Sequence, residues 1–253
     1  MKKIIFSSIL LFLFASTLSA QTVDEVIDKH IAALGGKEKL KSVKSVRMTL
    51  KGRAQGFEFP VEMVSKKNSG VKTVTTIQGM KMIQCYDENT KSGWAVNPMM
   101  GDKKAQKMNE EQTKQAQEQG GKMESDLLDY KEKGHTAEYL GKEDLDGEEV
   151  YLIKLNKKDG SITYYYIDVI TNLTIKEKTK QKLKDKEFEG ESWFSNYQTV
   201  DGITSPGTVE SYNNGILGFE ITMEKIEYNI EIDDAIFKMP DPNANNLEQN
   251  KEK

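Results

Sequence analysis

Residues 46–63 read VRMTLKGRAQGFEFPVEM. Apolar side chains alternate with polar ones from Val46 to Leu50 and again from Phe57 to Met63, and a glycine-containing turn separates the two runs. A period of two is typical of a β-strand with one buried face, and a short turn between two such runs favours antiparallel pairing. This stretch therefore predicts a β-hairpin.

The same alternation continues along most of the chain. Strands are predicted at 71–77, 80–86, 94–96, 150–155, 162–167, 173–180, 188–197, 208–212 and 217–228, with another beginning near residue 137. Turn sequences such as Asp159-Gly160 and Asn213-Asn214-Gly215 join neighbouring strands. We therefore predict an antiparallel meander in a mainly β chain with a few helices (α+β). No linker interrupts the strand series, which favours one domain.

The N-terminus has the layout of a secretory signal peptide. A basic start at residues 1–3 precedes an apolar run at 4–15 and small residues up to Ala20. No later apolar run approaches the roughly 20 residues that a membrane span needs. We expect residues 1–20 to be removed, or cleavage one residue earlier as the alternative, and the protein to reach the periplasm without a membrane anchor.

Helices are predicted in three places. Residues 22–34 have one apolar face and a capping box formed by Thr22 and Glu25. The polar, methionine-bearing region 97–121 is interpreted as a mobile flap or a surface helix, and residues 123–130 as a short helix. The charged tail at 241–253 is predicted to be disordered.

The composition leaves few routes to catalysis. The chain has 36 basic and 40 acidic residues, interspersed and with a net charge of −4, so no positive stripe indicates nucleic-acid binding. No phosphate loop, nucleophile elbow or zinc-binding cysteine spacing is present. We interpret His30 as a surface or boundary residue of the first helix, find no ligand set beside His135, and place Cys85 in the core. We expect no cofactor, no metal ion and no enzymatic activity.

Acidic residues leave one catalytic alternative open, a hydrolase that uses carboxylates at turns. Asp87, Asp144, Asp146, Asp159 and Asp201 all stand at predicted turns, where local hydrogen bonding already accounts for them. Asp87 and Asp201 would be the residues to test.

Several segments, taken in order, resemble the LolA-like outer-membrane lipoprotein-sorting proteins of the LolA/LolB superfamily. They are residues 26–36, Tyr86-Asp87 ahead of Trp94, residues 127–134, 147–155 and 200–206, and Asn229 with residues 233–240. The resemblance implies an incomplete antiparallel β-barrel over residues 21–240, closed off by helices, with an apolar concavity that holds acyl chains. The family's strand arginine has two possible counterparts, Arg47 and Arg53.

A sheet with bulky apolar residues on alternate positions and few helices to bury them predicts an apolar face that stays partly uncovered. Such a face is a ligand site by default, although each of its residues taken alone could simply fill the core. The predicted lining consists of Met48, Leu50, Phe57, Phe59, Val61, Met63, Met80, Met82, Trp94, Leu127, Tyr151, Ile153, Tyr164, Tyr166, Trp193, Phe219 and Met223.

The sequence and the resemblance together predict a soluble periplasmic carrier. It would bind acyl chains of lipoproteins or related lipids and ferry them towards the outer membrane, as a monomer and with inner- and outer-membrane transport proteins as possible partners. The alternative is a sensor or binding module on the same scaffold that detects envelope lipids or lipoproteins.

Overall fold

The structure, a computed structural model, describes residues 21–120, 125–183 and 186–241. The strands are β1 (Ser45–Ala54), β2 (Phe57–Lys66), β3 (Gly70–Ile77), β4 (Met80–Asp87), β5 (Ser92–Asn97), β6 (Asp102–Lys107), β7 (Thr136–Leu145), β8 (Glu148–Asn156), β9 (Ile162–Asp168), β10 (Thr174–Leu183), β11 (Lys186–Ser195), β12 (Gln198–Val200), β13 (Ile203–Ser205), β14 (Thr208–Asn213) and β15 (Ile216–Tyr228). The helices are α1 (Val23–Ala33), α2 (Lys37–Lys41) and α3 (Glu110–Gly120), with short 3-10 helices η1 (Pro98–Met100) and η2 (Asp234–Phe237).

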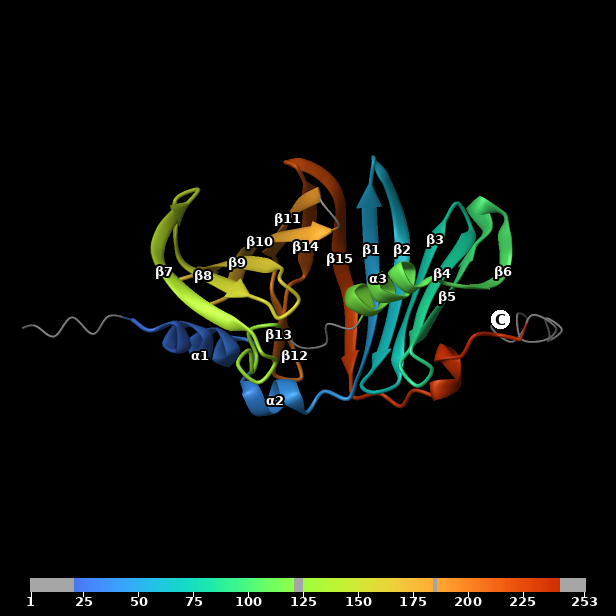
Figure 1. Cartoon of the computed structure of the whole chain (residues 1–253), viewed down its shortest axis with the longest axis horizontal. Helices are drawn as coiled ribbons and strands as arrows, with labels where there is room; N and C mark the ends of the chain where they lie inside the picture. The colour runs from blue at the N-terminus through green and yellow to red at the C-terminus, as the bar shows by residue number, and fades with distance from the viewer. Residues whose placement is uncertain (1–20, 121–124, 184–185, 242–253) are drawn as a thin grey trace, which may run out of the picture.

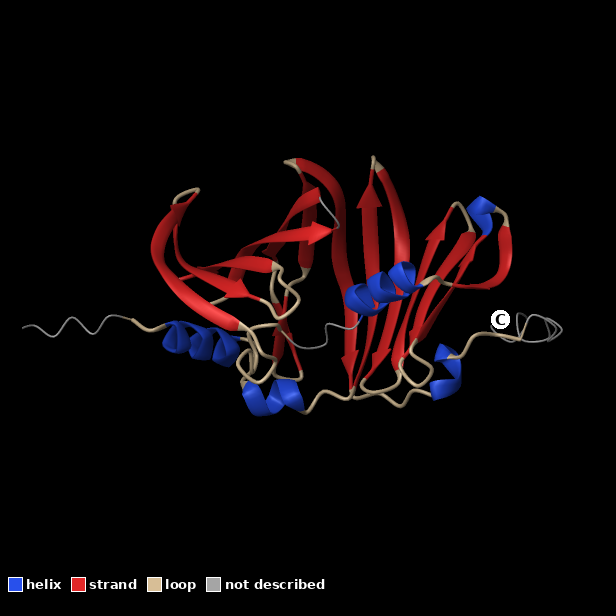
Figure 2. Ribbon diagram, viewed as in Figure 1, coloured by secondary structure: helices blue, strands red, loops and turns tan. Residues whose placement is uncertain are grey.

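Thirteen of these strands form one antiparallel sheet in the order β6-β5-β4-β3-β2-β1-β15-β14-β11-β10-β9-β8-β7, and β12 pairs with β13 as a separate hairpin. The sheet is curved and open, with β6 and β7 as its end strands (Figure 1, Figure 2). β1, the first strand of the chain, lies between β2 and the last strand, β15. The predicted mainly β, incomplete-barrel architecture is confirmed.

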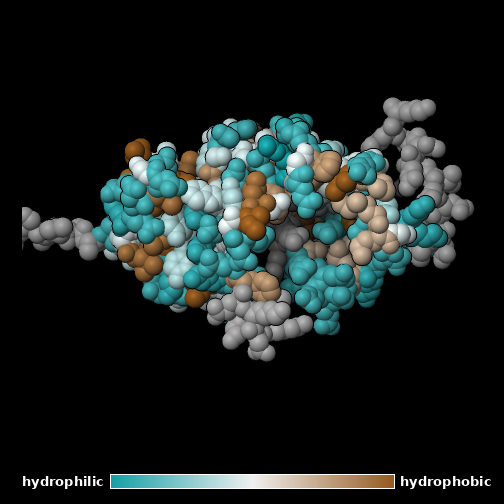
Figure 3. Space-filling view, turned by 90° about the horizontal axis from the view of Figure 1, so that it is seen from above, coloured by the Kyte–Doolittle hydropathy of each residue, from teal (hydrophilic) through white to brown (hydrophobic). Residues whose placement is uncertain are grey.

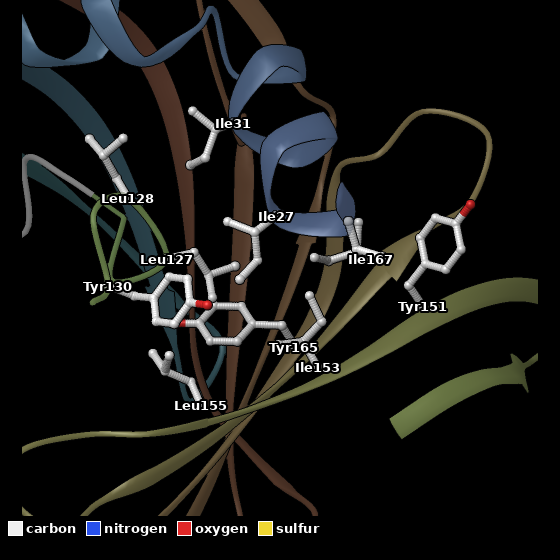
Figure 4. Close-up of a cluster of buried hydrophobic side chains, with 11 residues drawn as sticks. Ile27, Ile31, Leu127, Leu128, Tyr130, Tyr151, Ile153, Leu155, Tyr165 and Ile167 are labelled. Atoms are coloured by element: carbon white, nitrogen blue, oxygen red, sulfur yellow. The ribbon is translucent and has the colours of Figure 1, made fainter. Parts of the chain in front are cut away.

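The helix predicted at 22–34 is α1. The Thr22 hydroxyl accepts a hydrogen bond from the Glu25 N–H (3.2 Å), and the Glu25 carboxylate accepts one from the Thr22 N–H (3.0 Å). These two bonds are the predicted capping box. The apolar face of α1, which includes Ile27 and Ile31, packs on side chains of β8 and β9 such as Ile167 (Figure 4).

The prediction of a short helix at 123–130 is wrong for residues 125–130, which the structure describes. Residues 126–134 form a series of turns, and Asp129 has a left-handed backbone (φ 52°), which an α-helix does not accommodate. Leu127 and Leu128 are nevertheless buried in the same cluster as α1 (Figure 4). Lys37 and Lys41, the first and last residues of α2, both form ion pairs with the Asp129 carboxylate. These ion pairs attach the turns to α2.

The region predicted as a flap or surface helix, 97–121, contains η1, β6 and α3 in its described part. Ala116 of α3 is buried and packs with Val71 of β3 and Tyr86 of β4. A surface helix is therefore present. β6 was not predicted, because its sequence is almost wholly polar and shows no apolar alternation.

The sheet has two differently covered faces. Paired residues of neighbouring strands point to the same side, so the register places the side chains under α1 and those under α3 on one side, which we call the inner face. The other side, the outer face, carries η2, whose Phe237 is buried with Cys85 and Trp94.

The predicted signal peptide, residues 1–20, and residues 242–253 of the predicted disordered tail lie outside the described residues. Within the described ranges, no helix is long and apolar enough to cross a membrane.

Candidate functional site

The candidate site is a pocket of about 320 Å³ on the inner face, in the middle of the sheet. Strands β1, β2, β14 and β15 and the segment before β14 form it. The lining residues are Val46, Met48, Leu50, Met63, Ser65, Ser205, Pro206, Gly207, Val209, Ile221, Met223, Ile226 and Tyr228. Seen from above, the molecule is hollowed near its middle, with apolar surface beside the hollow (Figure 3).

Strand register brings these side chains together. Met48 of β1 lies opposite Met63 of β2 and Ile226 of β15, and all three point to the inner face. Leu50 is the next inward residue of β1, and it lies opposite Met223. The central strands thus present a continuous apolar surface.

A β-bulge makes this surface possible. Met223 and Ile226 are three residues apart, so a regular strand would point them to opposite faces. The pairing of β1 with β15 shifts between Thr49 and Leu50, which inserts one extra residue in β15 and turns both side chains inward.

The pocket remains open because other elements cover the two ends of the inner face. At one end α1 and residues 127–130 pack on β8 and β9, and at the other end α3 packs on β3 and β4. Leu40, Val43 and the β12–β13 hairpin, through Ile203, cover only part of the central strands. A concave apolar surface between covered regions is the usual setting of a small-molecule site.

Polar groups in the lining are few and uncharged. Ser205 Oγ and the Tyr228 hydroxyl are hydrogen bonded at 2.9 Å, and Ser65 is the other hydroxyl in the lining. Burial raises the pKa of Tyr228, although the hydrogen bond with Ser205 acts in the opposite direction, so the phenol is neutral at physiological pH. None of the lining residues carries a charge. The pocket therefore suits an apolar ligand with at most a hydrogen-bonding end.

Four of the residues predicted to line a cavity belong to this pocket: Met48, Leu50, Met63 and Met223. Six others lie on the inner face but outside the lining: Phe57, Phe59, Val61, Met80, Met82 and Phe219. Phe59 lies over Gly52, where a Cβ atom would be 2.2 Å from its ring. That glycine leaves the space which the Phe59 ring occupies.

Three more predicted residues fill the core under α1 instead: Leu127, Tyr151 and Ile153 are buried in the cluster shown in Figure 4. Packing by α1 occupies the space in front of them, so they are not available to the pocket.

The remaining four predicted residues, Trp94, Tyr164, Tyr166 and Trp193, point to the outer face. The Trp94 indole N–H donates to the carbonyl of Phe237 (2.8 Å), which holds η2 on that face. The Lys176 ammonium lies over the rings of Tyr166 and Trp193, 5.6 and 4.7 Å from their centroids. Trp94, Tyr166 and Trp193 thus have partners of their own, and all four side chains lie on the opposite side of the sheet from the pocket.

The two candidate family arginines are exposed and also point to the outer face. Arg47 lies opposite Glu227, and Arg53 lies 3.9 Å from the Glu220 carboxylate. Neither arginine reaches the pocket.

Several lining residues were not predicted from the sequence. Val46, Ile221 and Ile226 belong to strands that alternation had identified. Val46 shares the alternating positions of Met48 and Leu50 on β1, so the same pattern would have added it to the predicted lining. The Ser205-Pro206-Gly207 segment carries no such signal, because hydrogen bonds to residues distant in sequence place it in the lining. The Gly207 N–H donates to the Ser195 carbonyl, the Met223 N–H donates to the Gly207 carbonyl, and Ser205 is hydrogen bonded to Tyr228.

Of the two aspartates that we would test for catalysis, Asp87 has local hydrogen-bond partners. The Asp87 carboxylate is buried and accepts hydrogen bonds from the Asn89 N–H (2.9 Å) and the Thr90 hydroxyl (3.0 Å). Asp201 is exposed in the turn between β12 and β13. In the described ranges, no three His, Cys, Asp or Glu side chains come together as metal ligands.

The two histidines also make local contacts. His30 is buried, contrary to the surface or boundary position that its sequence context indicated, with Nδ1 2.8 Å from the Asn172 carbonyl oxygen. His135 Nδ1 accepts a hydrogen bond from the Lys158 N–H (3.2 Å).

Comparison with known proteins identifies the fold. No family model matches the sequence, and no curated protein matches it. Solved structures do match. A LolA superfamily protein, NE2245 from Nitrosomonas europaea, has a TM-score of 0.56 at 12% identity, over 87% of this chain and 98% of that one.

Two further structures agree. A putative outer membrane lipoprotein-sorting protein domain from Vibrio parahaemolyticus has a TM-score of 0.53 at 12% identity, over 84% of this chain and 94% of that one. A DUF1329 family protein from Desulfovibrio piger has a TM-score of 0.56 at 15% identity, over 87% and 98%. The chain therefore has a LolA-like fold, as the resemblance in its sequence predicted.

Proposed function

We propose that this protein of LolA-like fold binds the acyl chain of a lipid or lipoprotein in the pocket between β1, β2, β14 and β15. The observation that carries the proposal is the uncharged, mainly apolar lining of an open pocket on the inner face. The fold supports it, because one of the matching structures is described as a lipoprotein-sorting domain. The chemistry is reversible burial, without catalysis.

The free energy of hydration explains why acyl chains need such a site. Each methylene group moved out of water contributes about 0.8 kcal/mol, so a long chain exposed to water costs on the order of 10 kcal/mol. Methionine is suited to a lining that must accept chains of different shape, because its side chain is flexible and polarizable. Met48, Met63 and Met223 supply that property here.

The cellular role that we propose is that of a periplasmic carrier. The predicted signal peptide would export the chain, and the pocket would shelter acyl chains on their way towards the outer membrane. This role requires release as well as binding. An open pocket on a sheet surface, rather than an enclosed cavity, favours exchange.

Binding is tested with a fluorescent fatty acid and the variant Met48→Lys. Met48 is half-buried in the centre of the lining, so a lysine there introduces a charge that an acyl chain cannot solvate. We expect the wild-type protein to bind and the variant to lose at least tenfold in affinity. The matched control is Met82→Lys, because Met82 is a half-buried methionine of the same face that does not line the pocket.

No uptake by the wild-type protein would refute the proposal. Equal losses in both variants would also contradict it, since the effect would then not come from the pocket. The carrier role is tested separately, by adding the protein to spheroplasts and measuring whether acylated lipoprotein appears in the soluble fraction. Failure to release lipoprotein would limit the function to binding.

A further inference from the structure

Four hairpin tips lie along one edge of the sheet, at the top of Figure 1. They are the turns between β14 and β15, β1 and β2, β3 and β4, and β5 and β6, and they follow one another in the strand order. They share this edge because each strand runs antiparallel to its neighbour.

Three of the tips have the same local structure. Gln55-Gly56, Gln78-Gly79 and Asn214-Gly215 all have positive φ at both positions, the backbone of a two-residue type I′ hairpin turn. In each case the residue after the glycine is large and apolar: Phe57, Met80 or Ile216. The fourth tip contains Met99 and Met100 in η1.

These apolar side chains are exposed to an unusual degree. The exposed fraction is 70% for Phe57, 73% for Ile216 and 80% for Met100, with Leu217 and Phe219 close to half exposed. Apolar side chains collected at one edge of a protein mark an interaction surface.

Charge distinguishes this edge from the opposite one. Residues 54–57, 77–80, 97–101 and 213–219 contain no charged residue, although 30% of the chain is charged. The turns at the other ends of the same strands are charged, as in Lys66-Lys67 and Asp87-Glu88. The turn Asp146-Gly147 has the same positive-φ pair but is flanked by Glu148. The absence of charge therefore belongs to the four tips and does not follow from the turn type.

An apolar track connects two of these tips, β14–β15 and β1–β2, to the pocket. Along the inward positions of β15, Met223 is buried, Ile221 is half-buried and Phe219 is 43% exposed, and the strand begins at Ile216 in the tip. On β1 the corresponding positions are Leu50 and Gly52, the latter covered by Phe59. Along β15, exposure of the inward apolar side chains thus increases from the pocket to the edge.

We infer that this edge is the surface by which the protein contacts a lipid bilayer, with the tips inserted among the headgroups and the track leading from the membrane to the pocket. The inference rests on the proposed function. Separate apolar tips suit the headgroup–acyl boundary of a bilayer, which accepts apolar side chains without shape complementarity, better than they suit a protein partner, whose interface core packs as tightly as a protein interior. An acyl chain leaving a bilayer along this track would not cross bulk water.

The test is flotation of the protein, recovered from the periplasm of an expressing bacterium, with phosphatidylcholine vesicles. We expect the wild-type protein to bind these vesicles, which carry no net charge, and equally at 0.1 and 0.5 M salt, because the interaction is apolar. The variant F57D/I216D should bind at least tenfold more weakly. Both changes are at exposed positions, so the fold should be retained, which circular dichroism checks.

The matched control is Ile170→Asp. Ile170 is 84% exposed in the turn between β9 and β10, beside α1 and away from the four tips. We expect it to bind vesicles as the wild-type protein does. Equal loss in I170D and F57D/I216D, no binding by the wild-type protein, or binding that requires anionic lipid and disappears at high salt would each overturn the inference. A dimer of the wild-type protein that F57D/I216D dissociates would also overturn it, in favour of a second copy as the partner.

Fatty-acid uptake from solution separates this inference from the proposed function. F57D/I216D leaves the pocket lining intact, so it should take up a fluorescent fatty acid as the wild-type protein does. If no variant takes up fatty acid, the proposed function fails, while flotation still decides whether the edge binds membranes.

Discussion

At the scale of single residues, His30 shows how one buried polar group can make stability depend on pH. The residue is 3% exposed, and the Asn172 carbonyl can only accept, so Nδ1 carries the proton and donates across 2.8 Å. This bond joins α1 to the turn between β9 and β10. Burial lowers the pKa of His30 below its usual value of 6.5, and the backbone hydrogen bond offsets this only in part.

A lowered histidine pKa predicts loss of stability in acid. Below pH 6.5 the unfolded chain takes up a proton more readily than the native protein, so this contribution to stability is complete above pH 6.5 and decreases as the pH falls. We expect the free energy of unfolding to be lower at pH 5.5 than at pH 7.5. His30→Gln keeps a donor but does not titrate, so its difference between the two pH values should be smaller.

Urea unfolding of both proteins at the two pH values measures this effect. At pH 7.5 the variant itself should cost about 1 kcal/mol, the usual value of one altered hydrogen bond. The window lies above the ordinary pKa values of carboxyl groups, so Asp and Glu contribute little to it. The same pH dependence in both proteins would show that His30 is not responsible.

Residue patterns predicted which positions are apolar better than they predicted what those side chains contact. Met48, Leu50, Met63 and Met223 line the pocket, because alternation identifies residues that share a face. Trp94 is equally apolar but points to the outer face, where η2 covers it. Alternation does not show which of the two faces of a strand forms the pocket, since that depends on partners distant in sequence.

At the scale of elements, α3 is attached to the inner face by little buried surface. Among residues 110–117 of this helix, Ala116 is the one buried side chain. It packs with Val71 and Tyr86. Elements with few buried contacts open more readily than the core of a sheet. We therefore expect the amide hydrogens of α3 to exchange faster than those of β3 and β4.

Ala116→Glu should detach α3. A glutamate at this position brings a charge against apolar side chains, so amide exchange within α3 should accelerate further while that of β3 and β4 changes little. The cost in global stability should be small, about 1–2 kcal/mol, because the sheet does not depend on α3. Gln117→Glu is the matched control, with the same new charge at an exposed neighbouring position. Slow exchange in α3 of the Ala116 variant would show that other contacts hold it.

Elements with strong local signals were predicted and elements set by tertiary contacts were not. The capping box at Thr22 and turns such as Asn214-Gly215 are local, and both are present. The turns at 126–134 have helical apolar spacing, but the contacts of Leu127 and the ion pairs of Asp129 with α2 determine their backbone. β6 becomes a strand because the free edge of β5 offers it hydrogen bonds.

At the scale of the whole molecule, the pairing of β1 with β15 is the feature on which the pocket depends. It joins the two ends of the strand series and places the first and last strands in the middle of the sheet. The sequence predicts a meander, but the partner of β1 and the bulge beside Leu50 are long-range features without a local pattern. The resemblance to LolA-like proteins predicted the incomplete barrel, which the strand pattern alone left open.

Because the pocket is formed by strands from both ends of the series, a bound acyl chain should stabilise the entire sheet. Ligand at about 100 times its dissociation constant adds about 2.7 kcal/mol to the free energy of unfolding. For a domain of this size, each kcal/mol raises the melting temperature by about 2–4 °C, so we expect a rise of about 5–10 °C with a saturating long-chain fatty acid. Differential scanning fluorimetry measures it. Met48→Lys should lose this rise and Met82→Lys should keep it, since only the first substitution changes the pocket lining. A rise in melting temperature that persists in Met48→Lys would mean that the fatty acid binds elsewhere on the molecule.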